Sequence, residues 1–258
     1  MKILFLGQKP IGERCFEILM EYQNENMSVA GAVSNQSCEK VWWKSNTVYN
    51  VCVENDLLFI DNSKPNEELI IENIKSNNID FLVSVGHSWI LSDSILKMVS
   101  YQAVNLHLAK LPDYKGNYTY NHAILNGEKV YGVTLHWMTD KVDQGDYFLT
   151  DEFPVAIEDT AYSLYQKSLE AGVKLFRSFA QKIKEGGEMP RIPMTGRGKF
   201  YSRKSLDGLR KINDLNNTEE VLRKSRAFYF PPFENAYFLI DNRKFYIIPS
   251  FDEKEKSE

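Results

Sequence analysis

Residues Tyr101 to Tyr120, YQAVNLHLAKLPDYKGNYTY, form the stretch around which the rest of the chain is organised. The first half, Ala103 to Leu108, predicts a buried strand, because apolar residues alternate with Asn105 and His107. These two polar residues lie two positions apart, so both side chains point to the same side of a strand. An amide can donate a hydrogen bond, and an imidazole can move a proton near neutral pH. From this stretch alone, a catalytic pair and a satisfied buried polar pair both remain open.

The segments before this stretch predict strands that alternate with helices. Met1 to Leu6 is an apolar run that predicts a first strand, and Pro10 suits the first turn of a following helix. Met27 to Ser34 and the short run Val51 to Val53 predict further strands. Phe81 to Val85 has the continuous apolar pattern of a buried parallel strand. This alternation is typical of an α/β protein with a mostly parallel sheet and helices on both faces.

The end of the chain predicts a smaller unit. A short helix is predicted over Thr218 to Ser225. Two alternating segments, Ala236 to Ile240 and Arg243 to Ile248, flank Asp241-Asn242 and predict a β-hairpin. We therefore expect a large domain over residues 1–200 and a small C-terminal extension, with a short helix and a hairpin, over residues 201–258.

Composition excludes several classes of protein. The chain has 258 residues, of which 43% are hydrophobic and 26% charged, with a formal net charge of -4. This balance argues against a protein whose main task is to bind a nucleic-acid backbone, whereas small anionic ligands remain compatible with it. The three cysteines form no CxxC motif, so neither a disulfide framework nor a zinc site is predicted, and a cytoplasmic setting is expected. No run approaches the roughly 18 apolar residues of a membrane span.

Three kinds of side chain suit chemistry at the strand ends. Asn105 can donate to a developing oxyanion and His107 can accept or deliver a proton. An aspartate beside the histidine would stabilise its charged form, and the loop after the predicted strand Val130 to Trp137 offers Asp140, Asp143 and Asp146. This set suits acyl transfer without a covalent enzyme intermediate, since no GxSxG motif is present. The loop does not match the spacing of a calcium-binding EF-hand.

Lys9 is a further candidate for ligand binding. It follows the first predicted strand, at the edge where open α/β sheets bind their ligands. The alternative is an ordinary solvated loop residue, and the dinucleotide fingerprint GxGxxG is absent from this loop.

Together these motifs resemble the folate-dependent formyltransferase family, in its sugar N-formyltransferase branch. The family carries an Asn-x-His motif, a Leu-Pro-x-Tyr-Arg-Gly loop, a strand with Thr-x-His, and then Asp-x-Gly. The corresponding segments here are Asn105 to His107, Leu111 to Gly116, Val133 to His136 and Asp143 to Asp146. The resemblance covers about residues 1–200 and implies a Rossmann-like catalytic domain. Lys115 stands where arginine is usual, so a point charge replaces a planar fork.

The resemblance implies N10-formyltetrahydrofolate as co-substrate, with no metal. It assigns catalysis to Asn105, His107 and Asp143. The implied folate-binding residues are Gly86, Trp89, Ile90, Leu91, Asp140 and Asp146.

The acceptor implied by the resemblance is the amine of a nucleotide-linked amino sugar used in surface polysaccharides such as the lipopolysaccharide O-antigen. Arginine could meet a diphosphate and an aromatic ring could stack on a thymine or uracil base, although such aromatics could equally pack the hairpin onto the core. The implied substrate contacts are Lys9, Tyr114, Gly116, Arg203, Arg226, Tyr229 and Phe230.

Several acceptors and partners remain open within the resemblance. The preferred acceptor is dTDP-4-amino-4,6-dideoxyglucose, and a dTDP-3-amino-3,6-dideoxyhexose is the nearest alternative. Further alternatives are a glycinamide ribonucleotide formyltransferase and a nucleotide-sugar binding module without catalysis. The apolar hairpin, Ala236 to Ile248, predicts a homodimer. Nucleic acid is not an expected partner, and no membrane span is expected.

Overall fold

A computed structural model describes residues 1–40, 43–63 and 66–250 of the chain. The last eight residues of the predicted C-terminal extension, 251–258, thus lie outside the described residues. Contacts between residues divide the chain into two compact units. Unit 1 comprises Met1–Lys115, Gly132–Glu152 and Ser168–Lys199. Unit 2 comprises Gly116–Tyr131, Phe153–Lys167 and Phe200–Glu258.

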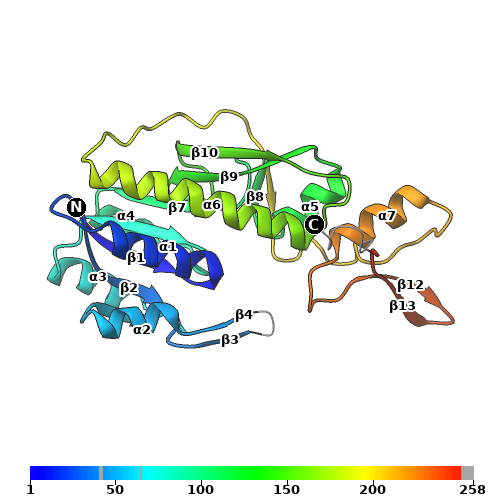
Figure 1. Ribbon diagram of the computed structural model, residues 1–258, viewed down its shortest axis with the longest axis horizontal. Coiled ribbons are helices and arrows are strands. Elements are labelled where there is room, and N and C mark those ends of the chain that lie inside the picture. Colours follow the sequence, from blue (N-terminus) through cyan, green and yellow to red (C-terminus); the bar gives the residue numbers. More distant parts are fainter. Residues whose placement is uncertain (41–42, 64–65, 251–258) are drawn as a thin grey trace, which may run out of the picture. The chain divides into compact units, whose positions relative to one another are not determined.

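The main sheet has seven strands in the order β10-β9-β7-β6-β1-β2-β5, and β1, β2, β7, β9 and β10 are labelled in Figure 1. Its strands are β1 (Lys2–Gly7), β2 (Ser28–Ser34), β5 (Leu58–Asp61), β6 (Phe81–Val85), β7 (Ala103–His107), β9 (Val130–Trp137) and β10 (Tyr147–Pro154). The pairs β5-β2, β2-β1, β1-β6 and β6-β7 are parallel, whereas β7 and β9 are antiparallel. The mostly parallel sheet predicted from the sequence is confirmed.

The rest of the described chain forms helices and short strands. The helices are α1 (Lys9–Tyr22), α2 (Thr47–Glu54), α3 (Glu67–Ser76), α4 (Asp93–Met98), α5 (Thr119–Asn126), α6 (Ala161–Lys184) and α7 (Thr218–Ala227). The short strands are β3 (Cys38–Lys40), β4 (Trp43–Ser45), β8 (Tyr114–Gly116), β11 (Lys199–Tyr201), β12 (Ala236–Ile240) and β13 (Arg243–Ile247). Side-chain caps fix where some helices begin: the Asn66, Ser92 and Asn217 side chains each accept one free backbone N–H of the first turn of α3, α4 and α7.

The strand predicted over Val51 to Val53 is wrong, because these residues lie in helix α2. Val48 and Cys52 are four residues apart and both buried, whereas Val53 is 61% exposed. This is the spacing of one buried helix face. A three-residue apolar run does not distinguish a strand from the buried side of a helix.

Alternation along β1 explains why helices cover both faces of the sheet. Phe5 points to one face and packs against Phe16 of α1, with ring centroids 5.1 Å apart. Leu4 and Leu6 point to the other face, where they join a buried cluster with Ile70 of α3 and other residues of α3 and α4. Successive side chains of a strand alternate between faces, so an apolar run such as β1 must be covered on both.

Strand order places the loops after β1 and β6 next to each other. From β1 the chain proceeds outward through β2 and β5, and from β6 it proceeds the other way through β7. Open α/β sheets bind ligands outside the carboxyl ends of the strands at such a reversal. Lys9, the first residue of α1, and Gly86 follow these two strands, and Asn105 and His107 lie at the end of the adjacent β7.

Unit 2 contains α5, α7 and the hairpin of β12 and β13. The hairpin is antiparallel, with Ile240 opposite Arg243, and its two turn residues, Asp241 and Asn242, have φ values of 48° and 60°. The hairpin predicted from the Asp-Asn pair is confirmed, since two residues with positive φ form the tight turn that matches strand twist. The Asn121 amide connects α5 to α7 by donating to the Ala227 carbonyl at 2.7 Å.

Within the part of the chain that the structure describes, none of the helices combines the length and hydrophobicity of a membrane span.

We predict that Gly31→Ala destabilises unit 1 by about 2–3 kcal/mol, as expected for overpacking. A Cβ at Gly31 in β2 would lie 2.1 Å from the Leu58 carbonyl oxygen of β5, and a backbone atom in a paired strand cannot move away easily. Urea denaturation of the variant measures the loss. Ser28→Ala, at the exposed start of β2, is the matched control and should stay within about 0.5 kcal/mol of the parent chain. Equal stability of the two variants would contradict the prediction.

Candidate active site

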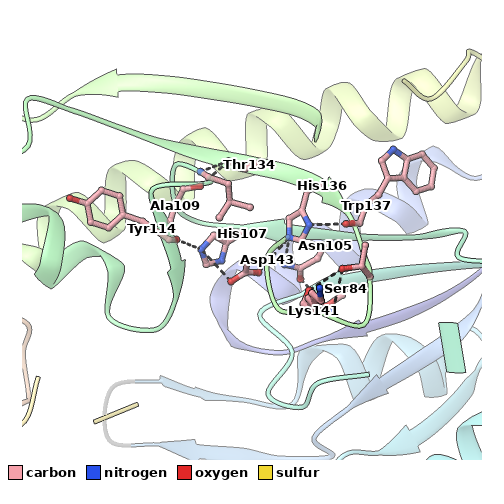
Figure 2. A network of polar contacts seen from close by, with 12 residues as sticks. Ser84, Asn105, His107, Ala109, Tyr114, Thr134, His136, Trp137, Lys141 and Asp143 are labelled. Atoms are coloured by element: carbon pink, nitrogen blue, oxygen red, sulfur yellow. Dashed lines mark hydrogen bonds and ion pairs between the residues drawn. The ribbon is translucent and has the colours of Figure 1, made fainter. Parts of the chain in front are cut away.

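Asn105 in β7 lies between one polar side chain on each neighbouring strand. It is paired in register with Ser84 of β6 and with His136 of β9. The Ser84 hydroxyl donates to Asn105 Oδ1 at 2.9 Å, and Asn105 Nδ2 lies 3.1 Å from His136 Nε2 (Figure 2). Ser84 and Asn105 share the sheet face that carries Leu82 and Ala103 of the α3/α4 core cluster. The polar group therefore continues this face toward the carboxyl ends of the strands.

His107 ends β7 on the same face as Asn105. Its Nε2 atom lies 2.8 Å from the Tyr114 carbonyl oxygen. A carbonyl oxygen only accepts, so Nε2 carries a proton and donates it in this contact. In a neutral imidazole the other ring nitrogen, Nδ1, is then the one without a proton.

Asp143 lies between the two histidines of the site. Its side chain is 9% exposed, with Oδ2 at 3.8 Å from His107 Nε2 and Oδ1 at 3.5 Å from His136 Nε2. Of the other two aspartates that the residue pattern alone left open, Asp140 is exposed at the loop surface, and Asp146 uses its carbonyl to accept the Trp137 N–H at 2.9 Å. The structure thus brings together Asn105, His107 and Asp143, while their catalytic roles stay predictions.

A close approach of two backbone segments places Asp143 there. Gly145 follows it by two residues, and a Cβ at this position would lie 1.7 Å from the Trp137 carbonyl oxygen. Only glycine fits such a contact. Asp143 itself has a φ of 53°, in the left-handed region. The loop therefore turns back sharply toward β9, and its carboxylate faces the polar side of β7.

The loop after β7 is anchored by Thr134 of β9. The Thr134 hydroxyl donates to the Ala109 carbonyl at 2.9 Å and accepts the Leu111 N–H at 3.2 Å. The Leu111 carbonyl in turn accepts the Tyr147 hydroxyl at 2.8 Å. These contacts hold the segment that carries the Tyr114 carbonyl, which fixes the His107 ring.

The residues predicted for folate binding all lie in unit 1, on two segments. Gly86 has a φ of 64°, and a Cβ there would lie 2.8 Å from the Gln8 carbonyl oxygen. Beyond it, Trp89 and Ile90 are exposed, with Ile90 at 70%, and Leu91 is buried. The second segment carries the exposed Asp140 and the half-buried Asp146. Their role in binding stays a prediction.

The residues predicted to contact the acceptor are divided between the units. Lys9 and Tyr114 belong to unit 1, where Lys9 has a φ of 69° and Tyr114 is buried. Gly116, Arg203, Arg226, Tyr229 and Phe230 belong to unit 2.

Within unit 2 these side chains differ in their surroundings. Arg203 is exposed. Arg226 donates from Nη1 to the Asp159 carbonyl at 3.1 Å, and burial, followed by repulsion from Arg223, lowers its pKa. The Phe230 ring packs against two aromatic rings of α6, with centroids 5.3 and 5.4 Å away. Arg226 and Phe230 therefore also make contacts that hold unit 2 together.

The sequence prediction missed Ser84 and His136 as members of the site. Ser84 is the one polar residue in the buried strand FLVSV, and that interruption is a usable signal. His136 lies two residues after Thr134 in an alternating strand, so it points to the same face. Neither signal indicates Asn105 as the partner, because that follows from the register of three strands.

His87, directly after Gly86, is a further titratable group near these loops. Burial, followed by the positive charge of Lys9, lowers its pKa from the ordinary 6.5 to about 4. Its Nδ1 atom is buried and has no hydrogen-bond partner among the described residues. Its imidazole is therefore neutral at physiological pH. Clusters of three or more potential metal ligands are absent from the described residues.

Comparison with known proteins gives a family model described as formyl transferase, which matches residues 1–179. The methionyl-tRNA formyltransferase of Clostridioides difficile (strain 630) is 30% identical over 189 residues, which cover 72% of this chain and 60% of that protein. The GDP-perosamine N-formyltransferase of Brucella melitensis biotype 1 is 29% identical over 173 residues, covering 67% of this chain and 65% of that protein. The matches thus span less than two thirds of the length of either relative.

Two solved structures share the fold of the chain. A 4-N formyltransferase from Francisella tularensis has a TM-score of 0.78 at 20% identity and covers 98% of both chains. An N-formyltransferase from Helicobacter canadensis, solved in complex with folinic acid and dTDP-3-aminofucose, has a TM-score of 0.73 at 23% identity. It covers 95% of this chain and 86% of its own. At these identities the similarity is evidence for a shared fold.

We predict that His87 makes the folded chain less stable in mild acid. Its pKa in the folded state is depressed to about 4, so the unfolded state binds the proton more readily. The contribution of the neutral His87 to the free energy of unfolding is fully present above about pH 6.5 and is lost as the pH falls toward about 4. Between about pH 7 and pH 5, the parent chain should lose about 2 kcal/mol more free energy of unfolding than His87→Gln. Urea denaturation at several pH values measures this, and parallel curves for the two proteins would contradict it.

Proposed function

The chain belongs to the formyl transferase family, whose model matches residues 1–179 of its 258, and from this premise we propose that it moves a formyl group from N10-formyltetrahydrofolate to the amine of a nucleotide-linked amino-dideoxy sugar. The observation that carries the proposal is the cluster of Asn105, His107 and Asp143 at the carboxyl end of β7. It supplies a hydrogen-bond donor, a proton carrier and a buried carboxylate, which acyl transfer to an amine requires.

In the proposed reaction, the neutral amine of the acceptor attacks the formyl carbon. A bond forms between the amine nitrogen and that carbon, and the carbonyl oxygen becomes an oxyanion. Asn105 has two N–H donors, one directed at His136, so the second is available to this oxygen. Donors aimed at developing charge stabilise the transition state more than the substrate.

His107 would carry the proton between the two nitrogens. Its Nε2–H is held by the Tyr114 carbonyl, which leaves Nδ1 to take the proton of the attacking amine. The same nitrogen then delivers the proton to N10 of the folate as the carbon–N10 bond breaks and tetrahydrofolate leaves. The Asp143 carboxylate, 3.8 Å from His107 Nε2, favours the imidazolium that exists between these steps.

A formylated folate as donor is supported by the family and by one related structure. The Helicobacter protein was solved with folinic acid, and it shares the fold of this chain. The segment from Gly86 to Leu91 has exposed residues next to a glycine at positive φ, and a residue without a Cβ allows a ligand to approach closely. We keep Gly86, Trp89, Ile90, Leu91, Asp140 and Asp146 as the proposed folate contacts.

An amino sugar as acceptor is supported by two relatives with different nucleotides. The Brucella relative is named for GDP-perosamine, and the Helicobacter structure holds dTDP-3-aminofucose. Our preferred acceptor is dTDP-4-amino-4,6-dideoxyglucose, with a dTDP-3-amino-3,6-dideoxyhexose as the alternative. The formylated sugar would then be consumed by a glycosyl transfer into a surface polysaccharide such as O-antigen. Arg203 and Arg226 remain proposed contacts for the diphosphate, because guanidinium groups bind phosphates by paired hydrogen bonds.

Methionyl-tRNA is the second candidate acceptor, because a methionyl-tRNA formyltransferase is 30% identical to this chain. Against it stands the formal net charge of -4, since proteins that bind an RNA backbone favour a basic footprint. Glycinamide ribonucleotide and binding without turnover are the remaining alternatives, and one substrate panel separates all four.

We propose the cytoplasm as the working compartment. Cys15 and Cys52 are free and buried, and burial raises the pKa of both thiols. Unpaired cysteines are usual where glutathione keeps thiols reduced.

The panel combines N10-formyltetrahydrofolate with dTDP- and UDP-linked amino sugars, GDP-perosamine, glycinamide ribonucleotide and initiator methionyl-tRNA. We expect a formylated product from a dTDP-amino sugar, and a fall in kcat of at least about 100-fold for Asn105→Ala and His107→Ala, as for loss of an oxyanion donor or a catalytic base. Gln144→Ala, exposed in the Asp143 loop, is the control and should keep its rate. Product from tRNA alone, or near-normal rates for either variant, would refute the proposal.

We also propose a homodimer formed through the hairpin of unit 2. Large apolar side chains on its two strands and just beyond are exposed: Leu239, Ile240, Phe245, Tyr246 and Ile248. Such a patch favours burial against a second copy. Light scattering should give twice the chain mass of 29.9 kDa, and the double variant Ile240→Lys, Phe245→Glu should give the mass of one chain. A parent protein that already has the single-chain mass would contradict the dimer.

A further inference from the structure

A row of hydrogen bonds begins at the Trp137 backbone and ends at Ser84. The Trp137 carbonyl oxygen lies 2.9 Å from His136 Nδ1. Because a carbonyl can only accept, Nδ1 must carry a proton in this contact. In a neutral imidazole the other nitrogen, Nε2, then has a free lone pair and acts as an acceptor. One backbone carbonyl thus sets the tautomer of His136.

The tautomer of His136 in turn orients the Asn105 amide. His136 Nε2, as an acceptor, lies 3.1 Å from Asn105 Nδ2, so the NH2 end of the amide faces the histidine. The Oδ1 end faces Ser84, whose hydroxyl donates to it at 2.9 Å. Ser84 is 3% exposed and His136 2%, so both partners of the amide are buried.

We propose that Ser84 and His136 are positioning residues, which fix the end of the Asn105 amide that faces the reacting formyl group. The proposal rests on the proposed function. The two ends of a carboxamide have nearly the same shape, but only the NH2 end can donate to an oxyanion. A reversed amide would present an acceptor oxygen where negative charge develops, and would repel it. The row of hydrogen bonds therefore keeps the NH2 end of the Asn105 amide in the donor position in the folded protein.

The nearby Asp143 shows which form of His136 the row of hydrogen bonds requires. Its Oδ1 atom lies 3.5 Å from His136 Nε2, farther than the Asn105 amide. If His136 carried a second proton, Nε2 would donate to this carboxylate and would face the NH2 group of Asn105 with another donor. The amide orientation thus requires a neutral His136, with Asp143 as its more distant neighbour.

The kinetic test is Ser84→Ala, which removes the donor to Oδ1. We expect kcat to fall about tenfold, because one of the two hydrogen bonds that hold the amide is then missing as charge develops on the oxyanion, and an ordinary hydrogen bond is worth about that factor. The KM values for the folate and the acceptor should not change, since Ser84 is buried at 3% exposure. Ser34→Ala, equally buried at 3% exposure in β2, is the matched control and should keep its kcat. An unchanged kcat in Ser84→Ala would overturn the proposal.

A double-mutant cycle separates positioning from general damage. If Ser84 acts through Asn105, then adding Ser84→Ala to Asn105→Ala should not lower the residual rate further. Additive losses would show that Ser84 acts by another route and would overturn the proposal.

A spectroscopic measurement on the parent protein tests the row of hydrogen bonds without a variant and without an activity assay. The ¹⁵N resonances of His136 in the parent protein should show the neutral form with the proton on Nδ1. A proton on Nε2 would overturn the proposal even if formyl transfer is found. If no acceptor in the panel is formylated, the proposed function fails, while the His136 spectrum still decides how the amide is oriented.

Discussion

The register between β6, β7 and β9 is the constraint on which the candidate site depends. Ser84, Asn105 and His136 lie opposite one another across three strands, so their side chains share one face of the sheet. A slip of one residue in either pairing would turn a polar side chain into the opposite face. The apolar residues before them, such as Leu82 and Ala103, are buried under α3 and α4 and hold this register. Packing in the core thus determines which polar atoms meet at the strand ends.

The Asp143 loop adds the charge that the strands alone do not provide. β9 runs antiparallel to β7, so the chain leaves β9 at Met138, beside the start of β7, and must return across the polar face. Gly145 makes that return possible because it lets the loop backbone pack against the Trp137 carbonyl. A buried carboxylate then lies within ion-pair distance of two histidines. Direct transfer between two bound substrates suits this group, since it offers donors and a proton carrier but no nucleophile in a recognised motif.

Sequence reasoning identified the structural features that depend on a local residue pattern or on a motif. The mostly parallel sheet, the turn at Asp241-Asn242 and the formyltransferase family follow from such features, and the structure and the family match confirm them. The residue pattern alone could not choose among the three aspartates, and the family resemblance was needed to select Asp143. Neither placed Ser84 and His136, because those contacts depend on long-range register. Val51 to Val53 was assigned to the wrong element, because a short apolar run carries no periodicity.

Single turnover with enzyme in excess tests the central claim, direct formyl transfer to an amino sugar, most directly. The donor is N10-formyltetrahydrofolate with a ¹³C-labelled formyl carbon, and the acceptor is dTDP-4-amino-4,6-dideoxyglucose. The proposed mechanism predicts that the label passes in one step into a formamide on the sugar, with no protein-bound label at any time. Label found on the protein, or released as formate while the sugar remains a free amine, would contradict it.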